Sequence, residues 1–286
     1  ILYQGGLAIN PLARLTGIEK KALALLQEDV DDSLFCLFQM LADSQIGYSS
    51  THALLCGSIF HLTETKLGMS AAHAQLLMFA AMTMNIGMAR DQDSMALQNN
   101  PPTDWQRELI RNHPQIGVDI LRAFGVDDET HLDIVRWHHA PEDPQAVPQN
   151  MPSRRLLHLA DSFIARTAAR KTRSSQSAVK AVKSMVLGAQ GDAIGVGSAM
   201  AQAVGFYPPG SYVRLANGEL AVAVQRGERA NTPWVISIAD KDGMPLNRYV
   251  CKDTLTPERT IQSPVNFESV RIAGNHDKVQ RARERI

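Results

Sequence analysis

Histidine and aspartate side chains recur through the middle of the chain, and both are common metal ligands in proteins. They are His52, His113, the adjacent pair His138-His139, and Asp161. An ion held by three or four nitrogen and oxygen ligands can act as a Lewis acid and lower the pKa of a bound water. The series therefore suggests hydrolytic metal chemistry, although a single histidine is more often a hydrogen-bonded core or surface residue.

The pair His138-His139 carries a further expectation. Neighbours on a helix point about 100° apart, so two adjacent rings suit a cleft with two sub-sites better than a single ion. The proline-rich segment 140–152 follows directly and should leave both rings exposed. The other histidines are interpreted as ordinary hydrogen-bonded residues: His61, His73, His131, His158 and His276.

An apolar stretch at residues 81–88 lies between the first two of these candidate ligands. It closes a helix that begins near Ser70 and is expected to end at Gly87. It carries Met84, Asn85 and Met88. Taken alone, it predicts a buried, methionine-rich helix end.

Apolar residues at spacings of three and four predict a mainly helical body around these residues. The pattern runs from Ile18 to about Gln45, with a break near Asp29. Residues 89–102 are predicted to be a loop, and Pro114 is expected to interrupt a helix that starts at Thr103. The other helices are expected from Ser49 or Ser50 to Lys66, from Asp128 to His138, from Ser153 past Asp161, from Ser177 to Gly188, and over 192–204.

The pattern changes after residue 205. Asn217-Gly218 and Asp242-Gly243 lie between strand-like runs and predict two hairpins, because Asn-Gly and Asp-Gly are strong hairpin signals. The predicted fold class is mainly α, a helical bundle followed by a small antiparallel β subdomain. The polar residues 262–286 are expected to be exposed or frayed.

Composition excludes several classes of protein. The 286 residues have a formal net charge of zero, which argues against a bulk nucleic-acid binder. No apolar run is long enough to span a membrane. Three scattered cysteines are expected to be reduced thiols in a cytoplasmic protein. The chain begins with Ile rather than Met, which is consistent with a fragment of a longer protein.

Several spaced motifs together resemble the HD-GYP family, bacterial cyclic di-GMP phosphodiesterases within the HD phosphohydrolases. The resemblance covers roughly residues 43–227. It rests on Tyr48 to His52, Ile86-Gly87, His113-Pro114 to Gly117, His138-His139, Ala160-Asp161, and Tyr207 to Glu219. It implies an HD-type helical bundle at 47–205, preceded by a helical segment at 1–46 and followed by a β subdomain at 206–262 and a polar tail at 263–286.

The resemblance also implies site residues. His52, His113, His138, His139 and Asp161 match metal ligands of the family. The segment Arg170-Lys171-Thr172-Arg173 matches a family segment, which implies phosphate binding by Arg170, Lys171 and Arg173, with a solvated basic run as the alternative.

The departures from the family fall on its chemistry. The family carries His-Asp where this chain has Met84-Asn85, and lysine where it has Met88. The glycine-containing substrate loop of the family is replaced by residues 141–148, which contain no glycine. A neutral amide is a poor bridge between two ions, and a thioether is a weak ligand for hard metals. We therefore expect at most one divalent ion (Fe, Mn or Zn) and no two-metal site.

Three functions remain open at this point. The favoured one is a catalytically impaired module of bacterial signal transduction that binds cyclic di-GMP or a partner such as a diguanylate cyclase. The alternative is a residual metal-dependent phosphodiesterase or phosphohydrolase that cleaves cyclic di-GMP or a related nucleotide. The third is a structural module that forms a homodimer through the helical region 18–45.

Overall fold

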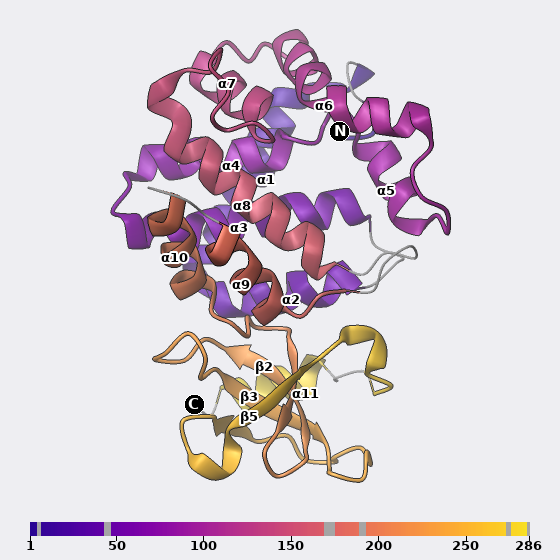
Figure 1. Cartoon of the computed structure of the whole chain (residues 1–286), viewed down its shortest axis with the longest axis vertical. Helices are drawn as coiled ribbons and strands as arrows, with labels where there is room; N and C mark the ends of the chain where they lie inside the picture. The colour runs from indigo at the N-terminus through magenta and orange to yellow at the C-terminus, as the bar shows by residue number, and fades with distance from the viewer. Residues whose placement is uncertain (5–6, 43–46, 169–174, 189–192, 273–275, 285–286) are drawn as a thin grey trace.

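The computed structural model describes residues 1–4, 7–42, 47–168, 175–188, 193–272 and 276–284. It consists of a helical body and, beyond the last of these helices, a small sheet flanked by one further helix (Figure 1). This arrangement confirms the predicted fold class. None of the described helices combines the length and the apolar character that crossing a membrane requires.

The helical body is organised around α3 (Tyr48–Leu67), which packs against five other helices. Its side chains Leu55, Cys56, Ile59 and Phe60 are fully buried in the main core. The other helices of the body are α1 (Pro11–Glu28), α2 (Val30–Ala42), α4 (Ala71–Thr83), α5 (Ala89–Leu97), α6 (Asp104–Ala123), α7 (Glu129–Trp137), α8 (Met151–Thr167), α9 (Ala178–Gly188) and α10 (Ala193–Val204). Because α3 is buried nearly all round, it fixes the positions of the helices that carry the candidate site.

Local capping chemistry explains several helix ends that the sequence predicted. The Ser70 hydroxyl accepts a hydrogen bond from the backbone N–H of His73 at the start of α4. Asp128 accepts from two backbone N–H groups at the start of α7. Gly68 ends α3 with φ of 66°, a left-handed conformation that glycine adopts without a Cβ clash. Such caps depend on adjacent residues and are readable from sequence.

The loop prediction for residues 89–102 is wrong over its first part. Residues Ala89–Leu97 form α5, which packs against α3 and buries Gln92, Met95 and Ala96. The stretch is polar overall, so its narrow apolar face is too short to register as a helical pattern. Packing against α3 stabilises the helix where its composition does not.

The prediction that Pro114 interrupts the helix from Thr103 is also wrong, because α6 continues through it. A proline inside a helix leaves the carbonyl four residues earlier without its N–H donor. Here that carbonyl belongs to Ile110, and the ring Nδ1 of His113 donates to it at 2.8 Å. The histidine therefore replaces the hydrogen bond that the proline removes.

Other expected helix ends differ from the structure. Helix α1 begins at Pro11, before the first apolar repeat at Ile18. Helix α4 ends at Thr83 rather than Gly87, and residues 84–88 form a turn. In the proline-rich segment, Pro148–Asn150 form a 3₁₀ turn and α8 starts at Met151, with Asn150 rather than Ser153 at its N-cap.

The β subdomain is one antiparallel sheet of five strands in the order β4-β3-β2-β1-β5. The Asn217-Gly218 hairpin is confirmed, with Gly218 at φ of 86° between β1 and β2. At Asp242-Gly243 the chain turns back, but only an isolated bridge joins the two sides of this turn; β3 forms its ladders with β2 and β4. The strands are β1 (Tyr212–Leu215), β2 (Leu220–Gln225), β3 (Trp234–Ala239), β4 (Cys251–Asp253) and β5 (Ile261–Val265).

Most described residues of the C-terminal segment are exposed, as expected, but much of the segment forms regular structure and is not a frayed tail. Residues Ile261–Val265 form the edge strand β5. His276–Arg283 form α11, which buries Val279 and Ala282. Arg283 donates to Asp29 and Asp32 near the start of α2, so the end of the chain is tied to its first helices.

Candidate metal centre

His113 is held by its own helix with one ring nitrogen left free. Its Nδ1 donates to the Ile110 carbonyl, which Pro114 leaves without a backbone donor. The ring is fully buried. Since Nδ1 carries the proton, Nε2 presents a lone pair, which is the form of histidine that binds metals.

His138, at the end of α7, also donates through Nδ1 to a backbone carbonyl. The last carbonyls of a helix have no N–H partner within it. The Nδ1 of His138 donates to one of them, that of Val135, at 2.7 Å. The ring is fully buried, so its Nε2 also presents a lone pair inside the protein.

The two free nitrogens face each other, with 3.4 Å between Nε2 of His113 and Nε2 of His138. Two lone pairs at this distance repel unless a proton or a cation lies between them. Ligands bonded to one zinc ion at tetrahedral angles lie about 3.3–3.4 Å apart, given bonds of about 2.0–2.1 Å. The spacing therefore suits two ligands of a single ion.

His139 completes a group of three ring nitrogens. One nitrogen from each of His113, His138 and His139 lies within 4.8 Å of the other two. The rings of His138 and His139 have centroids 4.1 Å apart, so the two rings belong to one group and do not point apart. Because α7 ends at Trp137, His139 is not constrained to point away as a helical neighbour would. The expected exposure holds only for His139, whose side chain is 40% exposed.

Burial keeps the three rings neutral at ordinary pH. It lowers the pKa of His113 to about 4, with repulsion from His139 as the second cause. It lowers the pKa of His138 well below the ordinary value, and that of His139 to a lesser degree. Neutral imidazoles can bind a cation without first losing a proton.

The other two predicted ligands form a pair beside this group. His52 on α3 donates through Nε2 to Asp161 Oδ1 on α8 at 2.8 Å, and its Nδ1 lies 3.1 Å from the Tyr48 hydroxyl. The second oxygen of Asp161 is 3.9 Å from Nδ1 of His139. Burial alone would raise the pKa of Asp161, but the hydrogen bond from His52 and the nearby rings lower it below its usual range. Asp161 is therefore an ionised carboxylate beside the cluster.

One face of α8 positions much of the centre. Arg154, His158 and Asp161 follow at spacings of four and three, which places them on the same face. His158 Nδ1 donates to the His138 carbonyl at 3.0 Å. Arg154 is buried, donates to the carbonyls of Pro141 and Val147, and forms an ion pair with Asp133 on α7.

The sequence reading missed two of these residues. His158 is an ordinary histidine in the interpretation from sequence, and no motif points to Arg154. Their spacing from Asp161 was the available signal, since all three lie on one helical face. Two side chains on this face donate to backbone carbonyls near the cluster: Arg154 to that of Pro141, and His158 to that of His138.

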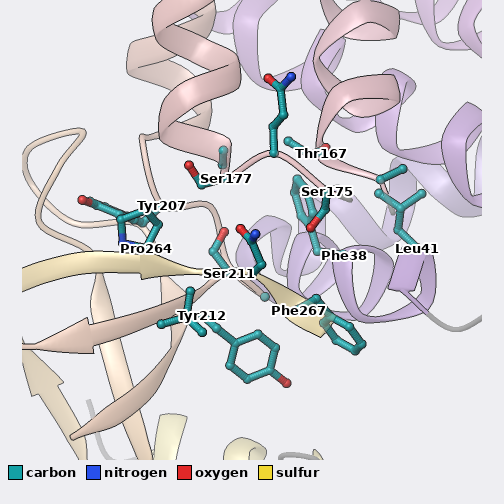
Figure 2. A pocket seen from close by; sticks show the side chains of 16 residues that line it. Phe38, Leu41, Thr167, Ser175, Ser177, Tyr207, Ser211, Tyr212, Pro264 and Phe267 are labelled. Carbon is teal, nitrogen blue, oxygen red and sulfur yellow. The ribbon is translucent and has the colours of Figure 1, made fainter. Parts of the chain in front are cut away.

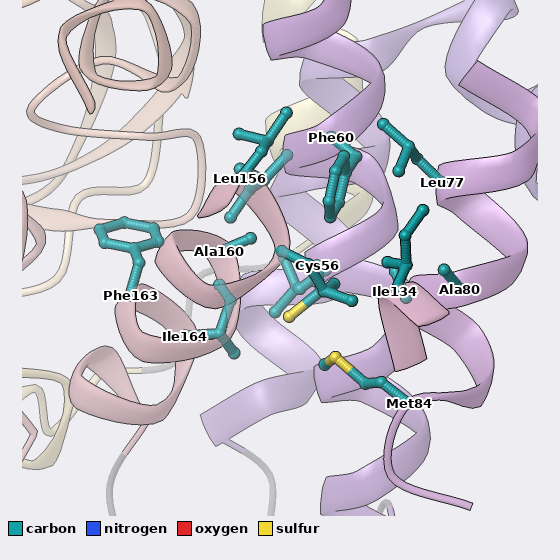
Figure 3. Close-up of a cluster of buried hydrophobic side chains, with 14 of the residues drawn as sticks. Cys56, Phe60, Leu77, Ala80, Met84, Ile134, Leu156, Ala160, Phe163 and Ile164 are labelled. Carbon is teal, nitrogen blue, oxygen red and sulfur yellow. The ribbon is translucent and has the colours of Figure 1, made fainter. Parts of the chain in front are cut away.

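The turn at residues 84–88 differs in character from the cluster. Met84 is fully buried in the main core, where its side chain points toward Cys56 (Figure 3). Met88 is also buried. Asn85 is 5% exposed, and neither its oxygen nor its nitrogen has a hydrogen-bond partner. The turn therefore supplies one neutral amide and no charged or imidazole ligand.

Close backbone packing holds this turn against α6. A Cβ added to Gly87 would lie 2.4 Å from the His113 carbonyl oxygen and 2.8 Å from the Gly117 nitrogen. A Cβ on Gly117 would lie 3.4 Å from Ile86. The two glycines of the matched motifs thus let the turn and α6 touch beside His113.

The three predicted phosphate-binding residues, Arg170, Lys171 and Arg173, lie outside the described residues. A small pocket is lined by residues of the helical body and of the β subdomain, among them Phe38, Ser175, Tyr207 and Phe267 (Figure 2). None of its described lining residues is charged. On these residues alone the pocket offers no counter-charge for a phosphate.

Comparison with known proteins gives one relative. The chain is 28% identical over 178 residues to the cyclic di-GMP phosphodiesterase PA4108 of Pseudomonas aeruginosa. The match takes in 57% of this chain and 43% of that protein, so the chain spans less than half the length of the relative. No protein-family model matches the chain. The chain is a distant homologue of this phosphodiesterase, which supports the HD-GYP resemblance.

Proposed function

We propose that the chain is a catalytically impaired HD-GYP-like domain that acts as a signalling, binding or protein-interaction module related to cyclic di-GMP. One observation carries the proposal. Met84 and Asn85 stand where the family that the chain resembles has its His-Asp pair, and Met84 is buried in the core. The flank that would complete a two-metal site is thus filled with apolar and neutral groups.

The histidine cluster fits a single divalent ion (Fe, Mn or Zn). His113, His138 and His139 would hold it, with Asp161 as a nearby carboxylate. Such an ion, when bound, supplies Lewis acidity and a bound water of lowered pKa. The chain keeps the rings neutral by burial, fixes two of them through backbone carbonyls, and keeps Asp161 ionised through His52.

A second ion does not fit the donor set. A bridging carboxylate offsets the repulsion between two cations, and Asn85 offers only a neutral carbonyl oxygen. Met84 faces the core, and a thioether is a poor ligand for these ions. Met88 has no charge to offer a phosphate. Each departure replaces a ligand or a charged group of the family with an apolar or neutral side chain.

The proposed ligand is cyclic di-GMP or a related nucleotide, and the proposed protein partner is a diguanylate cyclase domain. The similarity to a cyclic di-GMP phosphodiesterase supports the nucleotide class. We assign the function to residues 47–205, with 206–262 as an accompanying β subdomain.

The proposal is tested by adding cyclic di-GMP to protein loaded with Mn, Fe or Mg. We expect nucleotide binding or no interaction, but no hydrolysis above the rate with metal alone. Turnover that disappears in His138→Ala and Asp161→Ala would overturn impairment. It would favour the second candidate, a residual single-metal phosphodiesterase, which the retained three-histidine cluster supports.

A reversion variant tests whether only the ligands at positions 84 and 85 are missing or whether the rest of the site has also lost its ability to bind a second ion. Met84→His combined with Asn85→Asp restores the pair that the family carries. If the rest of the pocket is competent, the double variant should bind a second ion. The matched control is His276→Ala, which changes an exposed histidine on α11, outside the helical body.

A further inference from the structure

A second cavity lies in the helical body, between α1, α4 and the segment that leads into α7. Its volume is about 370 Å³. This is far more than the space that one water molecule requires. Its lining includes Glu19, Gln75, Phe79, Asp127, Asp128 and His131.

His131 lines this cavity and carries an unsatisfied acceptor. The Thr83 hydroxyl donates its proton to the Phe79 carbonyl at 2.8 Å, so toward His131 it can only accept. The His131 Nε2, 3.2 Å from that hydroxyl, is therefore the protonated nitrogen. Its Nδ1 is left with a lone pair and has no hydrogen-bond partner, while the residue is only 2% exposed.

Glu19 brings a buried carboxyl group from the opposite wall. It is 3% exposed and hydrogen-bonds to the side chain of Gln75. Burial raises the pKa of its carboxyl group. Lys20 is its charged neighbour in the chain but is not among the residues that line the cavity.

The lining as a whole is acidic and rich in acceptors. Glu19, Asp127 and Asp128 are carboxylates, and no lysine or arginine lines the cavity within the described part of the chain. The rest of the wall is largely apolar, with Phe79 and Leu76 from α4. The Phe79 ring lies 4.9 Å from that of His131.

We propose that this cavity binds a small organic cation, a primary ammonium group on an apolar body. The ammonium group has three N–H donors and a positive charge, which match the carboxylates and the bare nitrogen of His131. The apolar body would pack against Phe79 and Leu76, since aromatic rings also attract cations. An anion would meet no lysine or arginine among the described residues that line the cavity.

Calorimetry with 2-phenylethylammonium chloride tests the proposal on the whole chain, and phenylacetate serves as the anionic control of similar shape. We expect saturable binding of the ammonium compound and none of the acid. Glu19→Gln should weaken binding at least tenfold. Glu28→Gln, which removes the same charge from an exposed position at the end of the same helix, should change it by less than twofold.

An NMR titration gives a readout that does not depend on a variant. The ¹⁵N resonance of His131 Nδ1 should shift as the ammonium compound saturates the cavity, because the nitrogen gains a donor. If Glu19→Gln does not fold, the affinity of Asp127→Asn for the ammonium compound and the shift of this resonance test the proposal in its place. The proposal is overturned by an absence of saturable binding up to about 10 mM, by equal binding of phenylacetate, or by a folded Glu19→Gln variant of unchanged affinity.

Discussion

The histidine cluster and the turn at residues 84–88 both adjoin His113 of α6, yet they are built on different principles. Hydrogen bonds fix the cluster, with the Nδ1 atoms of His113 and His138 on backbone carbonyls. Packing fixes the turn, with Met84 in the core and Gly87 against the backbone of α6. The scaffold of a metal site can therefore persist while one flank loses its ligands, because the packed flank does not depend on them.

Energetics support this contrast. A fully buried methionine contributes roughly 1.5–3 kcal/mol through burial, which Met84 provides in the core. An unsatisfied buried polar group costs about 1–3 kcal/mol, and Asn85 has two such atoms. The turn thus gains stability at position 84 and loses some at position 85.

The largest effect is expected from His138→Ala. The variant removes a central ring of the cluster, so we expect its affinity for the metal to fall more than about 100-fold. Altering a residue that only supports a ligand typically costs less than this. Titration with a zinc indicator measures it, and His276→Ala serves as the control. Retained affinity in His138→Ala would mean that the ring nitrogens do not hold the ion.

Arg154→Met tests whether hydrogen bonds and charge support the cluster side. It leaves Asp133 buried without its ion-pair partner, which typically costs about 3–5 kcal/mol. Urea unfolding should show this loss. Adding Asp133→Leu should recover part of it, because no unpaired charge then remains. A loss below about 1 kcal/mol would show that the buried pair does not support the segment after His139.

Gly87→Ala tests the packing that supports the turn. A Cβ would meet the backbone of α6, so we expect a destabilisation of about 1–3 kcal/mol. Gly17→Ala is the control, since a Cβ there meets nothing within 4 Å and should be neutral or stabilising by up to about 1 kcal/mol. Equal effects of the two variants would contradict the close approach of turn and helix.

Acid should weaken the metal-free protein through its buried histidines. The pKa of His113 and that of His131 are about 4 in the folded state, below the ordinary value of 6.5. Between these values the unfolded chain binds more protons, so stability rises with pH and falls as pH drops from about 6.5 to 4. The slope should reach about 1.4 kcal/mol per pH unit for each histidine.

The acid effect is checked by urea unfolding at several pH values with a chelator present. His113→Asn should lower the slope of stability against pH between about pH 4 and 6.5, because the unfolded chain then binds about one proton fewer. An unchanged slope would mean that His113 is not buried in its neutral form.

The sequence predicted those parts of the fold that depend on neighbouring residues. The Ser70 cap, the Gly68 helix end and the Asn217-Gly218 hairpin are local hydrogen-bond and backbone effects. Helix α11 was missed because Arg283 finds its partners in Asp29 and Asp32, at the other end of the chain. Distant contacts of this kind leave no local pattern.

Prediction of the site had a similar limit. The spaced motifs identified all three histidines that the structure groups together. They did not reveal that His113 compensates for Pro114, nor that α7 ends early enough for His138 and His139 to share one cluster. Both facts depend on where a helix continues or stops, which is set by side-chain hydrogen bonds and tertiary packing.

The number of metal ions per chain tests the central claim most directly. After loading with Fe, Mn or Zn and removal of free metal, elemental analysis should give about one ion per chain, held by the histidine cluster. A value near two would contradict the claim that the turn at residues 84–88 no longer supports a second ion. A value below about 0.1 would contradict the cluster as a metal centre.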